Sequence, residues 1–130
     1  MTPDVLILAA FDPELAPFRS ALGDDFAATI AGRCITARVA GIGLPSAAVG
    51  AAMHIAELRP RAVVLVGTCG AYATSGLAIG DSVVARRLRL VGISSLSGQT
   101  EFPESMPVVT EAPYAYPENE LAAAPQGAHS

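Results

Sequence analysis

The sequence contains no lysine and no tryptophan, and only two cysteines and two histidines. All eight basic residues are arginines, which together with the abundant alanine indicates codon bias rather than a design for phosphate recognition. Cys34 and Cys69 lack the close spacing of a zinc or redox motif, and two cysteines do not make a disulfide framework. The cysteine pattern therefore predicts no metal site and favours a reducing, cytoplasmic setting.

Long apolar runs and large basic patches are also missing. No apolar stretch is long enough to span a bilayer, and the start Met-Thr-Pro-Asp lacks the basic residues of a secretory signal. The only basic cluster is formed by Arg86, Arg87 and Arg89, with no aromatic or glycine-rich binding element beside it. We therefore expect neither a membrane nor a nucleic acid as a partner.

The composition indicates a folded apolar core followed by an acidic, proline-rich tail. The apolar fraction of 52% is high enough to bury a core. The segment from Val91 to Ser130 has five glutamates, no basic residue and five prolines, and its periodicity disappears. We expect residues 1–90 to form the ordered part, and residues 91–130 to be a proline-rich, acidic tail with little packing.

Apolar runs and turn residues predict a strand, a helix and a hairpin in the first 40 residues. Val5–Ala10 is a short apolar strand, and Asp12-Pro13-Glu14 then starts a helix that would run to about Ala21 and stop near Gly23. Leu15 and Phe18 should form the buried side of this helix. Phe26–Ile30 and Cys34–Ala40 are predicted to pair as a hairpin.

The next segment predicts a parallel crossover. Pro45–Leu58 has few polar positions and should be a mostly buried helix, and Ala62–Val66 has the apolar pattern of a strand covered on both faces. Val5–Ala9, Cys34–Ala40 and Ala62–Val66 should then be neighbours in a mixed, largely parallel sheet within a three-layer α/β/α fold. Gly67–Ala71 would follow a central strand, and Ser82–Leu88 would form a further strand after the turn at Gly76–Gly80.

Several motifs that could be interpreted as functional also have a simpler structural explanation. Gly41-x-Gly43-x-x-Ser46 has neither Gly nor Ala at its third position and lacks the later acid of a dinucleotide site, so we reject that interpretation. An acid in a first helical turn, such as Glu14, is favoured there by the helix dipole without any catalytic role. A tight turn likewise accounts for the loop Gly67–Ala71 as well as a ligand site does.

Three other side chains are assigned structural roles. Cys69 has no histidine placed to activate it, and its apolar surroundings predict a buried, inert thiol. His54 is interpreted as a structural histidine on the small-residue helix. Asp81, between Gly80 and a predicted strand, is interpreted as a turn residue.

Four motifs taken together resemble one family. Ala9-Ala10-Phe11-Asp12-Pro13-Glu14, Ala40-Gly41-Ile42-Gly43, Val66-Gly67-Thr68-Cys69-Gly70-Ala71 and Gly76-Leu77-Ala78-Ile79-Gly80-Asp81-Ser82-Val83-Val84 resemble, in order and spacing, the purine and uridine phosphorylase superfamily. The resemblance covers nearly all of Met1–Leu90. It implies the amino-terminal half of a phosphorylase/hydrolase-like fold.

The start of the chain most resembles methylthioadenosine/S-adenosylhomocysteine nucleosidases, which cleave the N-glycosidic bond of purine nucleosides. The resemblance implies that Glu14 helps to activate the attacking water, and that the reaction needs no metal or organic cofactor. The remaining site residues implied by the resemblance all bind or border the substrate, with Ile42 near its 5′ substituent and the loop residues along ribose and base: Ala10, Phe11, Ile42, Gly43, Thr68, Cys69 and Gly70.

The sequence departs from this family in two ways. Leu65 stands where phosphorylases typically carry a phosphate-binding arginine, which favours hydrolysis over phosphorolysis. The Met-Glu motif that holds ribose and the Ser-Asp motif that protonates the purine do not occur, so we expect this chain, as a truncated form, to be weakly active or inactive. Two alternatives stay open, a phosphorylase and a non-catalytic nucleoside-binding remnant. The expected macromolecular partner is another copy of the chain or a complementing chain.

Overall fold

A computed structural model describes residues 2–85, 87–89, 91, 97–99, 101 and 109–111 of the chain. The chain divides into two compact units, Met1–Gly70 and Ala71–Ser130. The first unit contains the elements that position the candidate site. They are β1 (Val5–Ala9), α1 (Asp12–Leu15), the 3₁₀ turn η1 (Ala16–Phe18), α2 (Arg19–Leu22), β2 (Ala27–Ile30), β3 (Arg33–Val39), α3 (Leu44–Leu58) and β4 (Ala62–Leu65).

The first unit is built on a four-stranded sheet in the order β2-β3-β1-β4. β1 is parallel to both β3 and β4, with Val5 opposite Ile35 on one side and Ala62 on the other. β2 pairs with β3 in antiparallel fashion, as expected for the hairpin. The sheet is therefore mixed and largely parallel, and the three predicted neighbours are confirmed.

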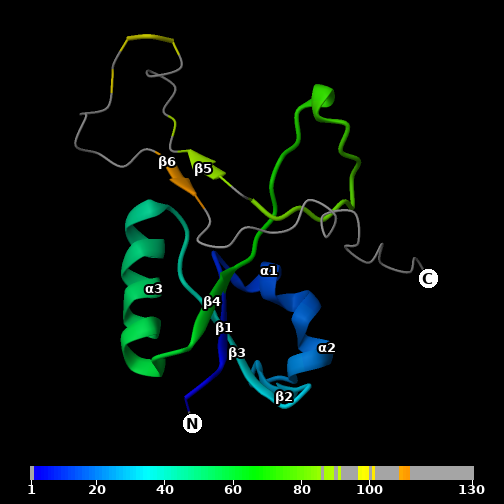
Figure 1. The fold of residues 1–130 in the computed structure, drawn as a ribbon, viewed down its shortest axis with the longest axis vertical. Helices are drawn as coiled ribbons and strands as arrows, with labels where there is room; N and C mark the ends of the chain where they lie inside the picture. The colour runs from blue at the N-terminus through cyan, green and yellow to red at the C-terminus, as the bar shows by residue number, and fades with distance from the viewer. Residues whose placement is uncertain are drawn as a thin grey trace. The chain divides into compact units, whose positions relative to one another are not determined.

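Helices cover both faces of this sheet, which gives the expected three layers. Figure 1 shows α3 on one side of the sheet and α1 with α2 on the other. On the α1 and α2 side, Leu15 and Leu22 pack with Ala9 and Ala37. On the other side, Leu6 and Leu8 form a second cluster with Ala40, against which Ala51 and Leu58 of α3 pack. Each fully buried leucine stabilises the fold by about 1.5–3 kcal/mol.

The first helical segment is broken, where the sequence predicted one continuous helix. Pro17 lies in its middle, and proline lacks the N–H that an α-helix requires there while its ring crowds the preceding turn. The 3₁₀ turn η1 therefore separates α1 from α2. α2 ends at Leu22, and Gly23 follows with φ 74°, so the predicted stop near Gly23 is confirmed.

Two predictions of burial are wrong. α3 has no buried residue, and Met53 on it is 64% exposed, because only one side of the helix packs on the sheet. β4 is exposed along its whole length, with Leu65 70% exposed. Among the described strands β4 lies at the sheet edge instead of the centre, since β1 takes the central position beside β3.

The second unit has a 3₁₀ turn, η2 (Ala73–Ser75), and an antiparallel pair formed by β5 (Arg87–Arg89) and β6 (Val109–Glu111). The predicted strand Ser82–Leu88 is mostly wrong, because residues 82–85 have no regular structure and the described strand is β5, Arg87–Arg89. A short turn ends at Gly80, where a strained backbone (φ 98°) suits glycine. Most of the predicted tail from Val91 to Ser130 lies outside the described residues.

Candidate active site

The carboxyl ends of three parallel strands meet at one edge of the sheet. The N–H of Ala40, just after β3, donates to the carbonyl of Ala9 at 2.8 Å. The N–H of Val66, just after β4, donates to the carbonyl of Leu8, also at 2.8 Å. The loops that leave the three strands therefore start side by side, and open α/β sheets place their ligands at this kind of edge.

Glu14 extends from α1 to two of these loops. Its Oε2 accepts a hydrogen bond from the N–H of Ala10 at 3.0 Å, and its Oε1 accepts one from the N–H of Thr68 at 3.0 Å. The hydroxyl of Thr68 donates to the same Oε1 at 3.3 Å. The carboxylate thus connects the end of β1 with the loop after β4.

The local sequence explains why Glu14 is placed in this way. Phe11 has an extended backbone, and α1 begins directly after it at Asp12, one residue earlier than predicted and without a side-chain cap. Pro13 in the first turn has the φ that a helix start requires. The N–H of Glu14 donates to the carbonyl of Phe11 at 3.1 Å, which folds the first turn back over the strand end.

Hydrogen bonding also sets the ionisation of Glu14. The backbone N–H of Thr68 is the largest cause that lowers the pKa of the carboxyl group below its ordinary value, and partial burial opposes it. The N–H of Ala10 and the hydroxyl of Thr68 lower the pKa further. These donors favour the charged form, so Glu14 is a carboxylate at neutral pH.

Gly67 allows the carboxylate to approach the loop; the sequence predicts it only as part of the loop Gly67–Ala71 and not among the named site residues. A Cβ atom at this position would lie 3.2 Å from Oε1 of Glu14, which is tighter than ordinary contact. At Gly70 a Cβ would meet nothing within 4 Å. A side chain at the first glycine would therefore displace the carboxylate of Glu14 by a few tenths of an ångström, whereas one at the second glycine would not touch it. Only the paired glycines of the loop hinted at this close approach.

The other predicted site residues lie on the same loops without a described contact to Glu14. Ile42 and Gly43 follow β3, and the side chain of Ile42 is 71% exposed. Cys69 is exposed as well, so the expected buried thiol is wrong, because the loop after β4 leaves the sheet edge instead of packing against it. The structure brings together Glu14, Ala10 and Thr68, with Phe11 beside them.

Two side chains interpreted as structural are joined to nearby backbone groups. Nε2 of His54 lies 3.0 Å from the carbonyl of Val39, so the ring ties α3 to the end of β3. In the second unit, Asp81 accepts the N–H of Ala78 at 2.8 Å, and its own N–H donates to the carbonyl of Ala78 at 3.2 Å. Asp81 is thereby confirmed as a turn residue.

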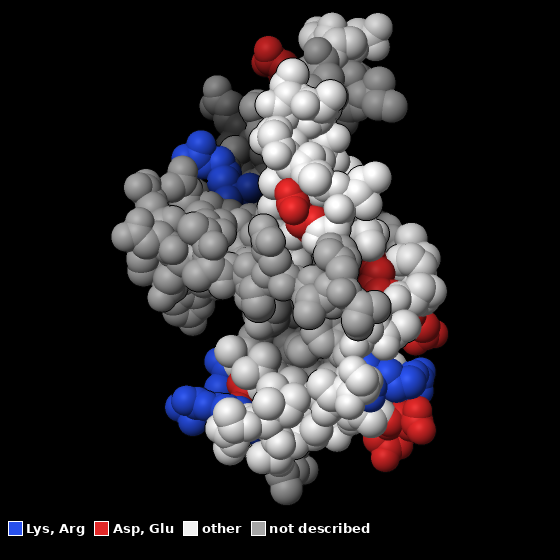
Figure 2. All heavy atoms as spheres, turned by 90° about the vertical axis from the view of Figure 1, so that its right-hand side faces the viewer, with Lys and Arg blue, Asp and Glu red and all other residues white. Residues whose placement is uncertain are grey.

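Charges and metal ligands are sparse in the part of the chain that is described. On the face shown in Figure 2, arginines and acids form small separate groups among uncharged residues. Among the described residues, no three His, Cys, Asp or Glu side chains are grouped so that they could hold a metal ion. None of the described helices is both long and apolar enough to cross a lipid bilayer.

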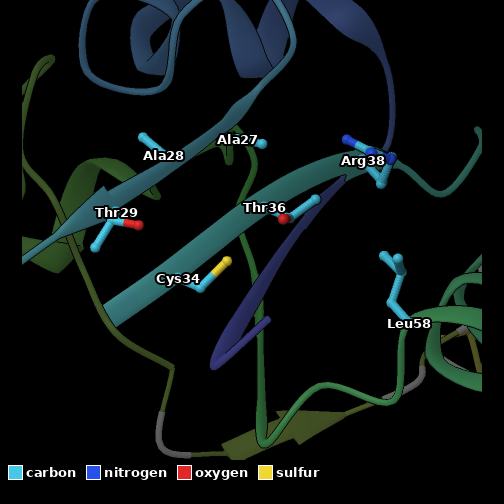
Figure 3. Close-up of a pocket in the computed structure, with 7 residues that line it drawn as sticks. All are labelled: Ala27, Ala28, Thr29, Cys34, Thr36, Arg38 and Leu58. Carbon is cyan, nitrogen blue, oxygen red and sulfur yellow. The ribbon is translucent and has the colours of Figure 1, made fainter. Parts of the chain in front are cut away.

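A hollow of about 430 Å³ lies over the β2–β3 hairpin and the end of α3, away from Glu14 and the loops around it. Figure 3 shows Cys34, Thr36 and Arg38 on the same face of β3, with Leu58 from α3 beside them. Arg38 donates to the backbone carbonyl of Ala37 at 2.8 Å. None of the predicted site residues lines this hollow, so it is separate from the site around Glu14.

Comparisons with known proteins agree with the fold. The solved structure of futalosine hydrolase of Helicobacter pylori strain 26695 is similar, with a TM-score of 0.63 and 22% sequence identity over 85% of this chain. The match covers 53% of that protein, so the chain spans about half of its length. No curated protein matches the sequence. A family model described as the phosphorylase superfamily matches residues 2–129, and the chain belongs to this superfamily.

Proposed function

We propose that this chain provides the water-activating part of a nucleosidase that hydrolyses the N-glycosidic bond of purine nucleosides of the methylthioadenosine type. The observation that carries the proposal is the carboxylate of Glu14, held between the loops after β1 and β4 by Ala10 and Thr68. A fixed carboxylate at a sheet edge can orient a water molecule and take its proton.

The reaction needs a carboxylate for a physical reason. As the bond to the purine breaks, the sugar carbon gains positive charge, and attack by neutral water must be accompanied by loss of a proton. A carboxylate near the sugar both stabilises the positive charge and accepts the proton. Ala10, Phe11, Ile42, Gly43, Thr68, Cys69 and Gly70 would then bind or border the substrate.

Hydrolysis is favoured over phosphorolysis by two observations. Leu65 is an exposed leucine at the position where the resemblance would place a phosphate-binding arginine. The structural neighbour is, by its name, a hydrolase. We therefore expect turnover of methylthioadenosine or futalosine to be independent of phosphate, and phosphate-dependent turnover would favour the phosphorylase instead.

The level of activity is part of the proposal. The Met-Glu and Ser-Asp motifs that the resemblance associates with ribose binding and purine protonation are not in the sequence. We therefore propose weak turnover by the chain alone. Turnover should increase when a second chain or a fused segment provides those groups.

The test compares two substitutions that each remove one carboxylate. Purine release from methylthioadenosine is measured with the wild-type chain, alone and with a carboxyl-terminal segment of a superfamily nucleosidase added or fused. Glu14→Gln should lower turnover by roughly 10²-fold with little change in nucleoside binding. Glu57→Gln, on the exposed side of α3, is the matched control and should not change it. Equal turnover in the Glu14→Gln variant and the wild type would falsify the catalytic assignment.

A further inference from the structure

The hollow over the β2–β3 hairpin begins where α3 stops covering the sheet. Leu6 and Leu8 of β1 belong to the apolar cluster against which α3 packs. Thr36 and Arg38 of β3 stand opposite these two leucines in the parallel register, so all four side chains lie on one face of the sheet. Leu58 is the last residue of α3 and lines the hollow on that side (Figure 3). The hollow of about 430 Å³ therefore occupies the part of this face beyond α3.

The floor of the hollow carries several polar groups. Cys34, Thr36 and Arg38 are alternate residues of β3, and alternate residues of a strand share a face. Thr29 of β2 is paired with Cys34 and adds a second hydroxyl. Among the described residues, no aspartate or glutamate lines the hollow. A ligand would therefore meet a guanidinium, two hydroxyls and a thiol, all of which can donate a hydrogen bond.

The hydroxyl of Thr36 is enclosed but has no partner. The residue is only 7% exposed, and its hydroxyl makes no hydrogen bond in the described part of the chain. Among the described residues, no fully enclosed side-chain oxygen or nitrogen lacks a partner, so this oxygen must be accessible through the hollow. An enclosed hydroxyl without a hydrogen bond is unfavourable. A ligand in the hollow that bonds to Thr36 would remove this cost.

Arg38 brings a positive charge that is not compensated locally. Its side chain is half-buried, and one guanidinium N–H donates to the carbonyl of Ala37 at 2.8 Å. A guanidinium has five N–H donors, so further donors are available. The ion pairs between described residues involve other arginines, and Arg38 has no acid partner among them. Arginines that leave the solvent are usually paired with a carboxylate or a phosphate.

We propose that the hollow binds a small organic carboxylate. Arg38 and Thr36 hold the carboxylate group, and the hydrocarbon part lies against Leu58. The volume of about 430 Å³ is within the range of small-molecule sites, which combine apolar walls with a few polar groups. The inference goes beyond the proposed nucleosidase activity and uses none of the residues around Glu14.

A carboxylate suits these groups better than a phosphate does. The hollow offers one positive charge, which balances a monoanion, whereas a phosphate group carries about −1.5 to −2 charges at neutral pH. The planar fork of Arg38 matches the two oxygens of a carboxylate. Ala27 and Leu58 also line the hollow, and they provide apolar surface for a hydrocarbon chain that inorganic phosphate lacks.

The binding is tested by NMR on the full chain, with butanoate as the probe. The backbone amide signals of Thr29, Cys34 and Thr36 and the side-chain Nε–H signal of Arg38 should shift together and saturate. The amide of Thr68 should not shift, because it belongs to the site around Glu14. Signals of Thr36 and Arg38 that do not respond, or a response confined to the loop of Thr68, would overturn the proposal.

Matched variants identify the groups that hold the carboxylate. Arg38→Gln removes the charge and should weaken butanoate binding by roughly 10-fold or more. Arg33→Gln is the control, because Arg33 lies on the same strand but does not line the hollow. Thr36→Val keeps the shape and should weaken binding by roughly 3–10-fold. The urea midpoint of Thr36→Val should not fall, since the hydroxyl has no protein partner to lose. Thr36→Val decides the question even where Arg38→Gln unfolds, and unchanged affinity in Thr36→Val would contradict the site.

A series of probes then tests the chemistry of the ligand. From acetate to butanoate and hexanoate, affinity should rise by roughly 3–4-fold for each CH₂ group that is buried. Butanol has the same carbon chain without the charge and should bind at least roughly 10-fold more weakly than butanoate. Equal affinity for butanol and butanoate would reduce the site to an apolar groove, and tighter binding of inorganic phosphate would reject the choice of a carboxylate. Glu14→Gln should leave butanoate binding unchanged, so this inference and the proposed function fail separately.

Discussion

Gly50 of α3 lies against the backbone of Ala40, just after β3, so closely that a Cβ atom at residue 50 would be 2.8 Å from the carbonyl carbon of Ala40. The helix therefore approaches the strand end at a point where only glycine fits. The hydrogen bond between His54 and Val39 lies one helical turn further along and holds the same contact.

Gly50→Ala should destabilise the protein, although alanine is the better helix former. In an open helix position the substitution would stabilise by about 0.8–1 kcal/mol. Here the added methyl group overlaps backbone, and overpacking of this kind costs about 1–3 kcal/mol. Urea unfolding distinguishes the two effects, because overpacking lowers the urea midpoint whereas the higher helix propensity of alanine raises it. We expect the midpoint to fall. A raised midpoint would mean that α3 does not contact Ala40 in solution.

Glu14 should make the stability of the protein depend on pH. Its pKa is lowered in the folded state, so the unfolded chain binds the proton more readily and stability rises with pH through this range. The contribution is complete above the ordinary pKa of glutamate and is lost as the pH falls through the folded value. The difference in urea midpoint between the wild type and the Glu14→Gln variant should therefore decrease as the pH is lowered from about 6 to about 3. A difference that stays constant across this range would exclude the linkage.

Asp4 should contribute to stability through a backbone hydrogen bond more than through its ion pair. Its Oδ2 accepts the N–H of Cys34 at 2.9 Å, which joins the starts of β1 and β3. Asp4→Ala leaves that N–H without its partner and should cost about 1–2 kcal/mol. Arg61 lies 3.7 Å from Oδ1, and its side chain is 75% exposed, so Arg61→Ala should change stability by less than about 0.5 kcal/mol. Thermal unfolding of both variants measures the two losses. Equal losses of stability in Asp4→Ala and Arg61→Ala would contradict this prediction.

The exposed edge strand should promote self-association. Val63, Val64 and Leu65 of β4 are 43%, 47% and 70% exposed, and no described strand pairs with the outer edge of β4. Exposed apolar edges tend to pair with other chains, and a charged residue opposes this. Sedimentation velocity should show concentration-dependent association that Leu65→Lys reduces. A wild-type chain that stays monomeric at the highest soluble concentration would count against the expectation.

The strand neighbours were predictable because β-branched runs and glycine turns are local signals. Val5–Ala9 and Ala62–Val66 are predicted from apolar runs alone, and the right-handed crossover rule places Cys34–Ala40 and Ala62–Val66 in one parallel sheet. These features depend on residues near one another in sequence.

The errors concern properties that depend on what surrounds a segment. The apolar pattern of β4 indicated two covered faces, but its burial is decided by neighbouring elements, and β1 takes the centre of the sheet. Cys69 was expected to be buried because nearby residues are apolar, whereas the direction of the loop exposes it. Pro17 was overlooked as a helix breaker, although this signal was present in the sequence. The contact of Gly67 with Glu14 needed coordinates, since nothing local specifies the approach.

The central place of β1 has a consequence for how the protein forms during synthesis. β1 leaves the ribosome before β3 and β4, yet Val5 pairs with Ile35 and Ala62, which are made later. Sheets that depend on such distant partners close slowly, because each loop must be ordered before its contacts form. Leu6 and Leu8 therefore stay unprotected until Ala62–Leu65 has emerged. We therefore expect nascent β1 to be a segment that a chaperone can bind during this delay.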